Sequence, residues 1–122
     1  MGRFVLPDSA LPLVAARFKA LSEPARLALL STLQHGEQTV NELVVGTGLG
    51  QANVSKHLQV LHAQGFVKRR KNGLFVHYML SDRHLMKLCE AMLLRVNENV
   101  SSHGVGRGQT PTGRRDDSDE VG

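Results

Sequence analysis

Apolar residues recur at three- and four-residue intervals in the first third of the chain, the spacing that places side chains on one face of an α-helix. The pattern predicts one helix over 11–21 and a second over about 23–34. Ser22 is expected to supply the N-cap oxygen of the second helix. Pro24 suits its first turn, where a missing amide costs nothing, and His35-Gly36 ends it.

Two shorter helical patterns follow, separated by a turn that contains glycine. Thr39 and Glu42 match a capping box, in which each side chain accepts a hydrogen bond from the other residue's backbone amide. They predict a third helix that reaches about Thr47, and Gly48-Leu49-Gly50 reads as a turn. A fourth helix is expected over about 51–64, with Gly65 as its left-handed stop.

After the fourth helix the pattern changes from helical to β. The runs 66–71 and 74–80 are rich in residues that favour strands, and the Asn72-Gly73 pair between them is a strong hairpin signal. Ser81 or Asp82 is expected to cap a fifth helix that ends near Asn99. The apolar stripe of this helix consists of Leu85, Leu88, Cys89, Met92 and Val96.

The order of these elements predicts a mainly α fold with a β-hairpin wing, that is, a winged helix-turn-helix with five helices. Residues 1–10 are expected to form an N-terminal arm and 11–99 the folded domain. Residues 100–122 are expected to be a disordered tail, because they are rich in Gly, Ser, Thr and charge and contain almost nothing apolar. No membrane span and no signal-peptide pattern is evident, so a cytoplasmic location is expected.

The charge distribution bears on the kind of partner. The formal net charge is +4, and no acidic residue lies between Glu42 and Asp82. A solvated basic surface would explain this interval, but so would a binding surface for a polyanion such as DNA or RNA. The cations in the interval are Lys56, Lys68, Arg69, Arg70 and Lys71.

The fourth helix carries polar residues around the apolar positions Val54 and Leu58. Gln and Asn side chains can pair with adenine in the major groove, and the cations of the hairpin can contact phosphates or a minor groove. The alternative is that the polar helix and the charged hairpin are simply solvated. The occurrence of the capped third helix, the glycine turn, the polar fourth helix and the basic hairpin in this order favours DNA binding over that alternative. The predicted DNA-contacting residues are Gln51, Asn53, Ser55, Lys56, His57, Gln59, Arg69, Arg70 and Lys71.

Other classes of function have less support. The sequence has no Gly-rich phosphate loop and no nucleophile beside a plausible base, so an enzyme is not expected. A winged-helix module that binds RNA or another protein stays open as an alternative, because basic hairpins do not by themselves distinguish DNA from RNA.

The runs LSEPARLALLSTL, TVNELVVGTGLGQANVSKHLQVLHAQGFVKRRKNGLFVHYML and LSDRHLMKL resemble the winged-helix repressors of the ArsR/SmtB family, over about residues 11–99. The resemblance implies a homodimeric bacterial repressor that binds an inverted-repeat operator and releases it when an inducer binds. It also implies dimerisation through the first and last helices. The interface would then bury Leu85, Leu88, Cys89 and Met92.

The resemblance also suggests a metal site on the last helix. Asp82 and His84 match the first pair of ligands in the zinc sensors of the family, but Arg95 stands where the second histidine would be, with Glu98 after it. A cation in place of an imidazole removes a ligand and repels a divalent ion. No metal or other cofactor is therefore expected, Asp82 is interpreted as a helix cap, and an Asp82–Arg95 ion pair across the dimer is an alternative use. A nickel or cobalt site that is completed by His103 is a weaker alternative.

Cysteine-based sensing is the remaining possibility. The arsenic and cadmium sensors of the family use thiols on the third helix, and residues 42–46 of this chain offer none. Persulfide sensors use two cysteines per chain, whereas Cys89 is the only one here. Antiparallel pairing of the last helices would place Cys89 near the two-fold axis, so a redox response through an intersubunit disulfide is the alternative to a buried, inert thiol. The sequence does not identify the inducer.

Overall fold

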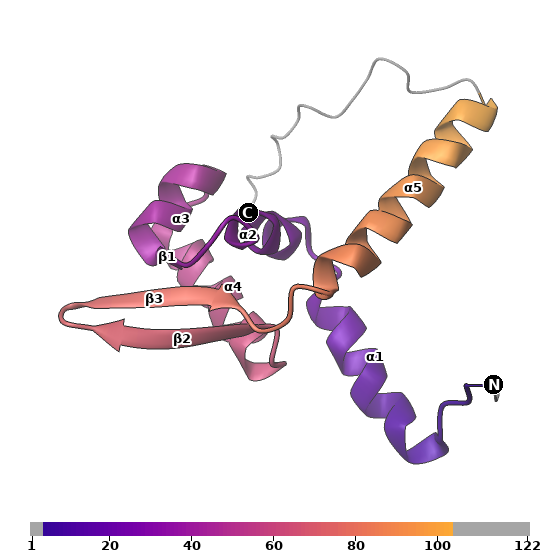
Figure 1. The fold of residues 1–122 in the computed structure, drawn as a ribbon, viewed down its shortest axis with the longest axis horizontal. Helices are drawn as coiled ribbons and strands as arrows, with labels where there is room; N and C mark the ends of the chain where they lie inside the picture. Colours follow the sequence, from indigo (N-terminus) through magenta and orange to yellow (C-terminus); the bar gives the residue numbers. More distant parts are fainter. Residues whose placement is uncertain (1–3, 104–122) are drawn as a thin grey trace.

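The computed structural model describes residues 4–103, with side chains described as far as residue 98. It is a winged helix-turn-helix with five α-helices in that range, so the predicted fold class is confirmed (Figure 1). In chain order the elements are the 3-10 turn η1 (Asp8–Ala10), α1 (Leu11–Ala20), α2 (Pro24–Leu33), β1 (Gln38–Thr39), α3 (Val40–Thr47), α4 (Gln51–Ala63), β2 (Val67–Asn72), β3 (Phe75–Leu80) and α5 (Leu85–His103).

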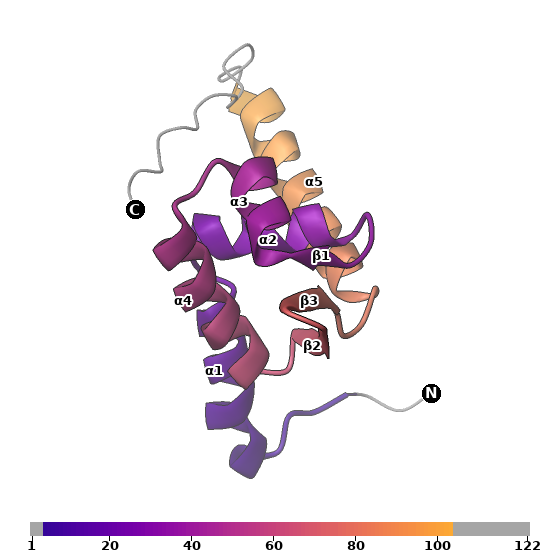
Figure 2. The same ribbon diagram turned by 90° about the vertical axis from the view of Figure 1, so that its left-hand side faces the viewer.

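The elements form a compact unit with two projecting helices. Helices α2, α3 and α4 pack together with the sheet, while α1 and α5 extend away from it on the side opposite the tip of the β2–β3 hairpin (Figures 1 and 2). Helix α5 runs to His103, beyond the end that the sequence predicted near Asn99. The rest of the predicted tail lies outside the described residues.

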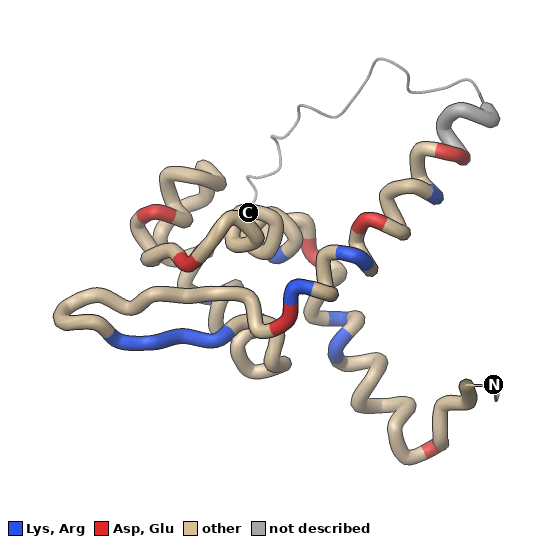
Figure 3. The backbone as a smooth tube through the Cα atoms, in the orientation of Figure 1, with Lys and Arg blue, Asp and Glu red and all other residues tan. Residues whose placement is uncertain are grey.

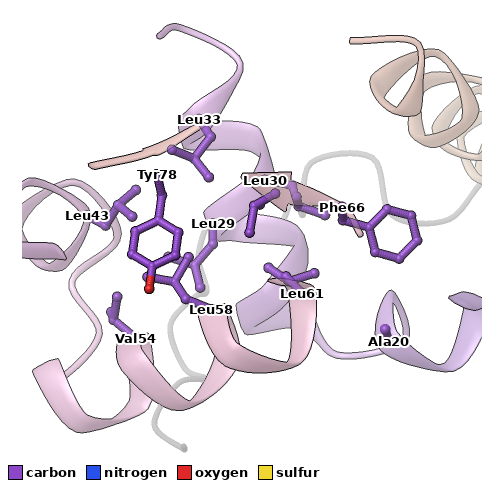
Figure 4. Packing of buried hydrophobic residues seen from close by; sticks show 11 residues of the cluster. Ala20, Leu29, Leu30, Leu33, Leu43, Val54, Leu58, Leu61, Phe66 and Tyr78 are labelled. Carbon is purple, nitrogen blue, oxygen red and sulfur yellow. The ribbon is translucent and has the colours of Figure 1, made fainter. Parts of the chain in front are cut away.

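The core lies where the three packed helices meet the sheet. Leu29 and Leu30 of α2, Leu43 of α3 and Leu58 of α4 are completely buried (Figure 4). Tyr78 of β3, the central strand of the sheet, also belongs to this cluster. Because each helix gives a narrow apolar stripe to one shared core, the outer faces of α3 and α4 are left for other contacts.

The sheet has three antiparallel strands in the order β1-β3-β2. Strand β1 was not predicted, since two residues are too few to show an alternating pattern. It pairs Gln38 with Tyr78 and Thr39 with His77, so the segment before α3 is hydrogen-bonded to the hairpin. The wing is therefore anchored to the helix-turn-helix through β3.

The hairpin turn lies one residue later than the sequence predicted. Asn72 pairs with Phe75, so the loop consists of Gly73 and Leu74 rather than Asn72 and Gly73. Gly73 has a φ of 65°, and no residue other than glycine has a positive φ in the described chain. Glycine with positive φ at the first loop position only is the pattern of a type II′ turn, whose twist matches the flanking strands.

The helix ends show which local signals the chain uses. The predicted capping box is confirmed: Thr39 Oγ1 accepts from the Glu42 amide at 3.2 Å, and Glu42 Oε1 accepts from the Thr39 amide at 2.9 Å. Gly65 has the predicted left-handed φ, at 78°. The prediction for Ser22 is wrong, because Glu23 is the N-cap of α2 and the Ser22 hydroxyl donates to the Lys19 carbonyl at 2.7 Å.

Candidate nucleic-acid interface

Helix α4 separates its residues into two faces. Val54 and Leu58 point into the core, while Lys56 and Gln59 are exposed on the opposite side and Gln51 is exposed in the first turn. Two other predicted contact residues, Asn53 and Ser55, are half-buried at the border. The helix begins at Gly50 without a side-chain cap and has no acidic residue in its first turn. Its positive end is therefore free of competing carboxylates, as an approach to phosphate requires.

His57 does not belong to the exposed face, so the sequence-based placement of its side chain on that face is wrong. Its exposed fraction is only 9%. It lies three residues after Val54 and four before Leu61, which is the spacing of the buried stripe. This helical period is the signal that could have identified His57 as an inward-facing residue from the sequence.

One guanidinium connects His57 to two other elements. Arg26 of α2 lies 3.2 Å from His57 Nδ1 through one terminal nitrogen, and its Nε donates to the Ala20 carbonyl at the end of α1 at 2.6 Å. A guanidinium can only donate, so Nδ1 is the acceptor and the ring proton belongs on Nε2. Burial, aided by the positive charge of Arg26, lowers the pKa of His57 below its ordinary value and favours this neutral ring.

Strand β2 supplies the second half of the candidate interface. Four consecutive cations, Lys68 to Lys71, lie along this strand and are exposed (Figure 3). The register places Arg69 opposite Tyr78 and Arg70 opposite His77. Successive side chains of a strand point to opposite faces, so the positive charge surrounds the wing instead of coating one side.

Arg70 is not a free cation. Its guanidinium pairs with both carboxylate oxygens of Glu37, one contact being Nε to Oε1 at 3.2 Å. His77 Nδ1 lies 3.9 Å from the same carboxylate. The hydrogen bond from Arg70 lowers the pKa of Glu37, so the carboxylate stays charged. Glu37 was not predicted as part of this site, because only the unpredicted β1–β3 pairing brings it to the wing.

The start of α5 carries the residues that suggested a metal site. Asp82 Oδ1 accepts from the His84 amide at 2.9 Å and lies 3.0 Å from His84 Nδ1, which lowers the Asp82 pKa. The helix begins at Leu85, later than predicted, and Asp82 caps the turn before it. Arg95 Nη1 lies 4.0 Å from Glu98. Among the side chains that the structure describes, those of residues 4–98 in one chain, no group of three or more His, Cys, Asp or Glu could hold a metal ion.

The projecting helices leave apolar side chains exposed. Leu13 and Phe18 of α1 are 68% and 54% exposed, and Met92 and Leu93 of α5 are 59% and 56% exposed. A hollow of about 360 Å³ lies between the two helices, where Leu85 and Leu88 line it. Cys89 is half-buried, and burial raises the pKa of its thiol. Large exposed apolar side chains on two projecting helices are typical of an interface between protein chains.

Comparison with known proteins identifies the family of this chain. The sequence pattern described as "Bacterial regulatory protein, arsR family" matches residues 23–69. The biofilm growth-associated repressor of Xylella fastidiosa is 39% identical over 79 residues, which cover 65% of this chain and 69% of that protein. The chain belongs to the ArsR/SmtB family of transcriptional repressors. Family members are DNA-binding regulators and not enzymes.

Further comparisons extend the ArsR/SmtB assignment to the fold. A transcriptional repressor SmtB homolog of Synechocystis is 39% identical over 75 residues, covering 62% of this chain and 57% of that repressor. The homodimeric winged helix-turn-helix DNA-binding domain from Mycobacterium bovis, a possible ArsR-family regulator, superimposes with a TM-score of 0.67 at 28% identity. It covers 80% of this chain and 91% of its own. No helix within the described residues is long and apolar enough to cross a membrane.

Proposed function

We propose that this ArsR/SmtB protein is a cytoplasmic repressor that binds an inverted-repeat operator as a homodimer and leaves it when an inducer binds. The observation that carries the proposal is the juxtaposition of an exposed polar face on α4 with the four cations of β2. One surface reads base edges and the other binds the phosphates beside them.

The exposed face of α4 has the chemistry that major-groove reading requires. Gln51 and Gln59 can each pair with the edge of a different base, donating one hydrogen bond to it and accepting another from it. Lys56 can reach guanine or a phosphate. The core residues on the other face hold the helix against α2 and α3, so its polar residues are presented by a rigid element. The uncapped N-terminus of α4 adds backbone amides for a phosphate.

Dimerisation through α1 and α5 would arrange two such surfaces. The exposed apolar residues of both helices lie on the side of the molecule opposite the wing tip (Figure 1). A two-fold axis on that side leaves both wings and both α4 helices outward. Two recognition helices related in this way read half-sites about one helical turn apart, which accounts for an inverted repeat.

Neither the binding of a metal ion nor the oxidation of the Cys89 thiol is the favoured inducing signal. Arg95 introduces a positive charge where a zinc sensor would have a ligand, and the raised pKa of Cys89 makes its reactive thiolate scarce near neutral pH. Elemental analysis after exposure to zinc, nickel and cobalt tests the first point. Stoichiometric metal that also releases DNA would reverse this part of the proposal.

The central experiment is a salt series with four nucleic acids. A duplex selected from a random pool, a random duplex, a single strand and a folded RNA are titrated at several salt concentrations. The selected duplex should bind best, with a preference that persists at moderate salt because base contacts do not depend on released counterions. Equal binding of all four would refute the repressor, and preference for RNA would favour the alternative module.

A further inference from the structure

The contacts of Arg26 have a consequence for DNA reading, and the inference rests on the proposed function. We propose that Arg26 and His57 are positioning residues that fix the DNA-reading helix α4 relative to helix α1, and that they do so only while His57 is neutral. Neither side chain needs to contact DNA for this role. The consequence is a loss of sequence discrimination at acidic pH.

The geometry makes Arg26 a direct connection between the two helices. It joins the last carbonyl of α1, at Ala20, to the middle of α4, at His57. Ala20 is itself buried, at 4% exposure. A cation at a helix C-terminus is stabilised by the carbonyl dipoles, so Arg26 is well held at this end. The orientation of α4 therefore depends on the atom that Arg26 meets at the other end.

That atom accepts a hydrogen bond in only one protonation state. Neutral His57 offers the Nδ1 lone pair to Arg26, whereas the protonated ring places an N–H and a positive charge 3.2 Å from a guanidinium nitrogen. The other charged groups that act on the ring are Glu23 at the start of α2, which favours protonation, and Lys56 on α4, which opposes it. Burial opposes it most strongly. Protonation of His57 at acidic pH thus replaces its hydrogen bond with Arg26 by an electrostatic repulsion.

The sign of the pH effect separates this role from general electrostatics. The His57 pKa is lowered in the folded protein, so the contact is intact at the ordinary histidine pKa of about 6.5 and is lost only as the pH falls through the lowered value. Acidification also makes the net charge of the protein more positive, which strengthens non-specific binding to DNA. Affinity for random duplex should therefore rise on acidification, while the ratio of specific to random affinity falls.

The test is the pH profile of that ratio, measured between pH 8 and 5.5 with a duplex selected at pH 7.5 and a random duplex. The wild type should lose at least fivefold in the ratio below about pH 6. His57→Asn should have a flat profile, because an amide oxygen can accept the Arg26 bond near the Nδ1 position without titrating. His62→Asn, the same change on the same helix, should retain the wild-type profile.

A second measurement observes the contact without DNA. Titration of the His57 ring by NMR should give a pKa below 6.5 in the wild type and a higher value in Arg26→Gln, which removes the neighbouring charge. A wild-type profile in His57→Asn, or an unchanged His57 pKa in Arg26→Gln, would overturn the inference. A wild type with no preference for the selected duplex at pH 7.5 would instead refute the proposed repressor, and the positioning role with it.

Discussion

Glu37 and Arg70 are 33 residues apart in the sequence, yet the carboxylate binds the guanidinium through both of its oxygens. The pair ties the wing to the segment between α2 and β1, and it places a negative charge beside the cations that we propose contact DNA. Glu37→Gln should therefore raise the affinity for every duplex by a few-fold and steepen its salt dependence by about one ion, because Arg70 becomes available to a phosphate.

The control for this change is Asp8→Asn, which removes the same charge from the N-terminal turn η1, away from the wing (Figure 3). It should alter affinity much less. Arg70 is the group that Glu37→Gln releases. In a protein that already carries Arg70→Ala, Glu37→Gln should therefore change the affinity for duplex DNA very little. A gain of the same size in Asp8→Asn would mean that only net charge matters.

The two halves of the interface should respond differently to substitution. Gln51→Ala removes an exposed side chain of α4 that we propose reads a base, and should cost roughly 1–3 kcal/mol of discrimination between the selected and the random duplex. Arg69→Ala removes a wing cation, and should weaken both duplexes alike while the salt slope falls by about one. Titrations at three salt concentrations measure both quantities. Identical effects of the two variants would contradict the division of roles.

The capping box at the start of α3 should be important for stability. Thr39→Ala removes the oxygen that accepts from the Glu42 amide, and should lower the free energy of unfolding by about 1 kcal/mol. Ser31→Ala, on the exposed face of α2, should change it by less than about 0.5 kcal/mol. Thermal unfolding followed by circular dichroism compares the two. Equal melting temperatures would show that the cap contributes nothing measurable.

Cys89 should react slowly near neutral pH. Burial raises its thiol pKa, so the thiolate that attacks disulfide reagents is scarce at pH 7 and becomes abundant only above the ordinary range of thiols. The rate of labelling in the folded protein should be well below that of the unfolded chain at the same pH. A covalent dimer that forms rapidly with oxidant, and is absent from Cys89→Ser, would restore the redox alternative.

The sequence predicted those features that depend on local periodicity and local chemistry. The five helices, the capping box and the stop at Gly65 follow from signals within a few residues of each other. On α4, Gln51, Lys56 and Gln59 are exposed as expected, but Asn53 and Ser55 are half-buried, and His57, which was expected on the exposed face, is buried. That error arose because a histidine was read as polar by type, although its position in the helical repeat is that of a core residue.

Features that depend on distant partners were not predictable in this way. Strand β1 exists because β3 offers it hydrogen bonds, and the Glu37–Arg70 pair exists because β1 brings the two residues together. The turn at Gly73 and Leu74 is also set by the register of the strands instead of by the strongest local signal. The contact between Arg26 and His57 joins two helices that no local pattern relates.

The position of β2 at the edge of the sheet gives its cations a second consequence. Among the strands within residues 4–103, the order β1-β3-β2 makes β2 an edge strand, to which a strand of another molecule could add. Four consecutive charges, Lys68 to Lys71, oppose such an addition by mutual repulsion and by their hydration. Replacing them together by neutral residues would therefore make the protein prone to aggregate through its wing, besides weakening its hold on DNA.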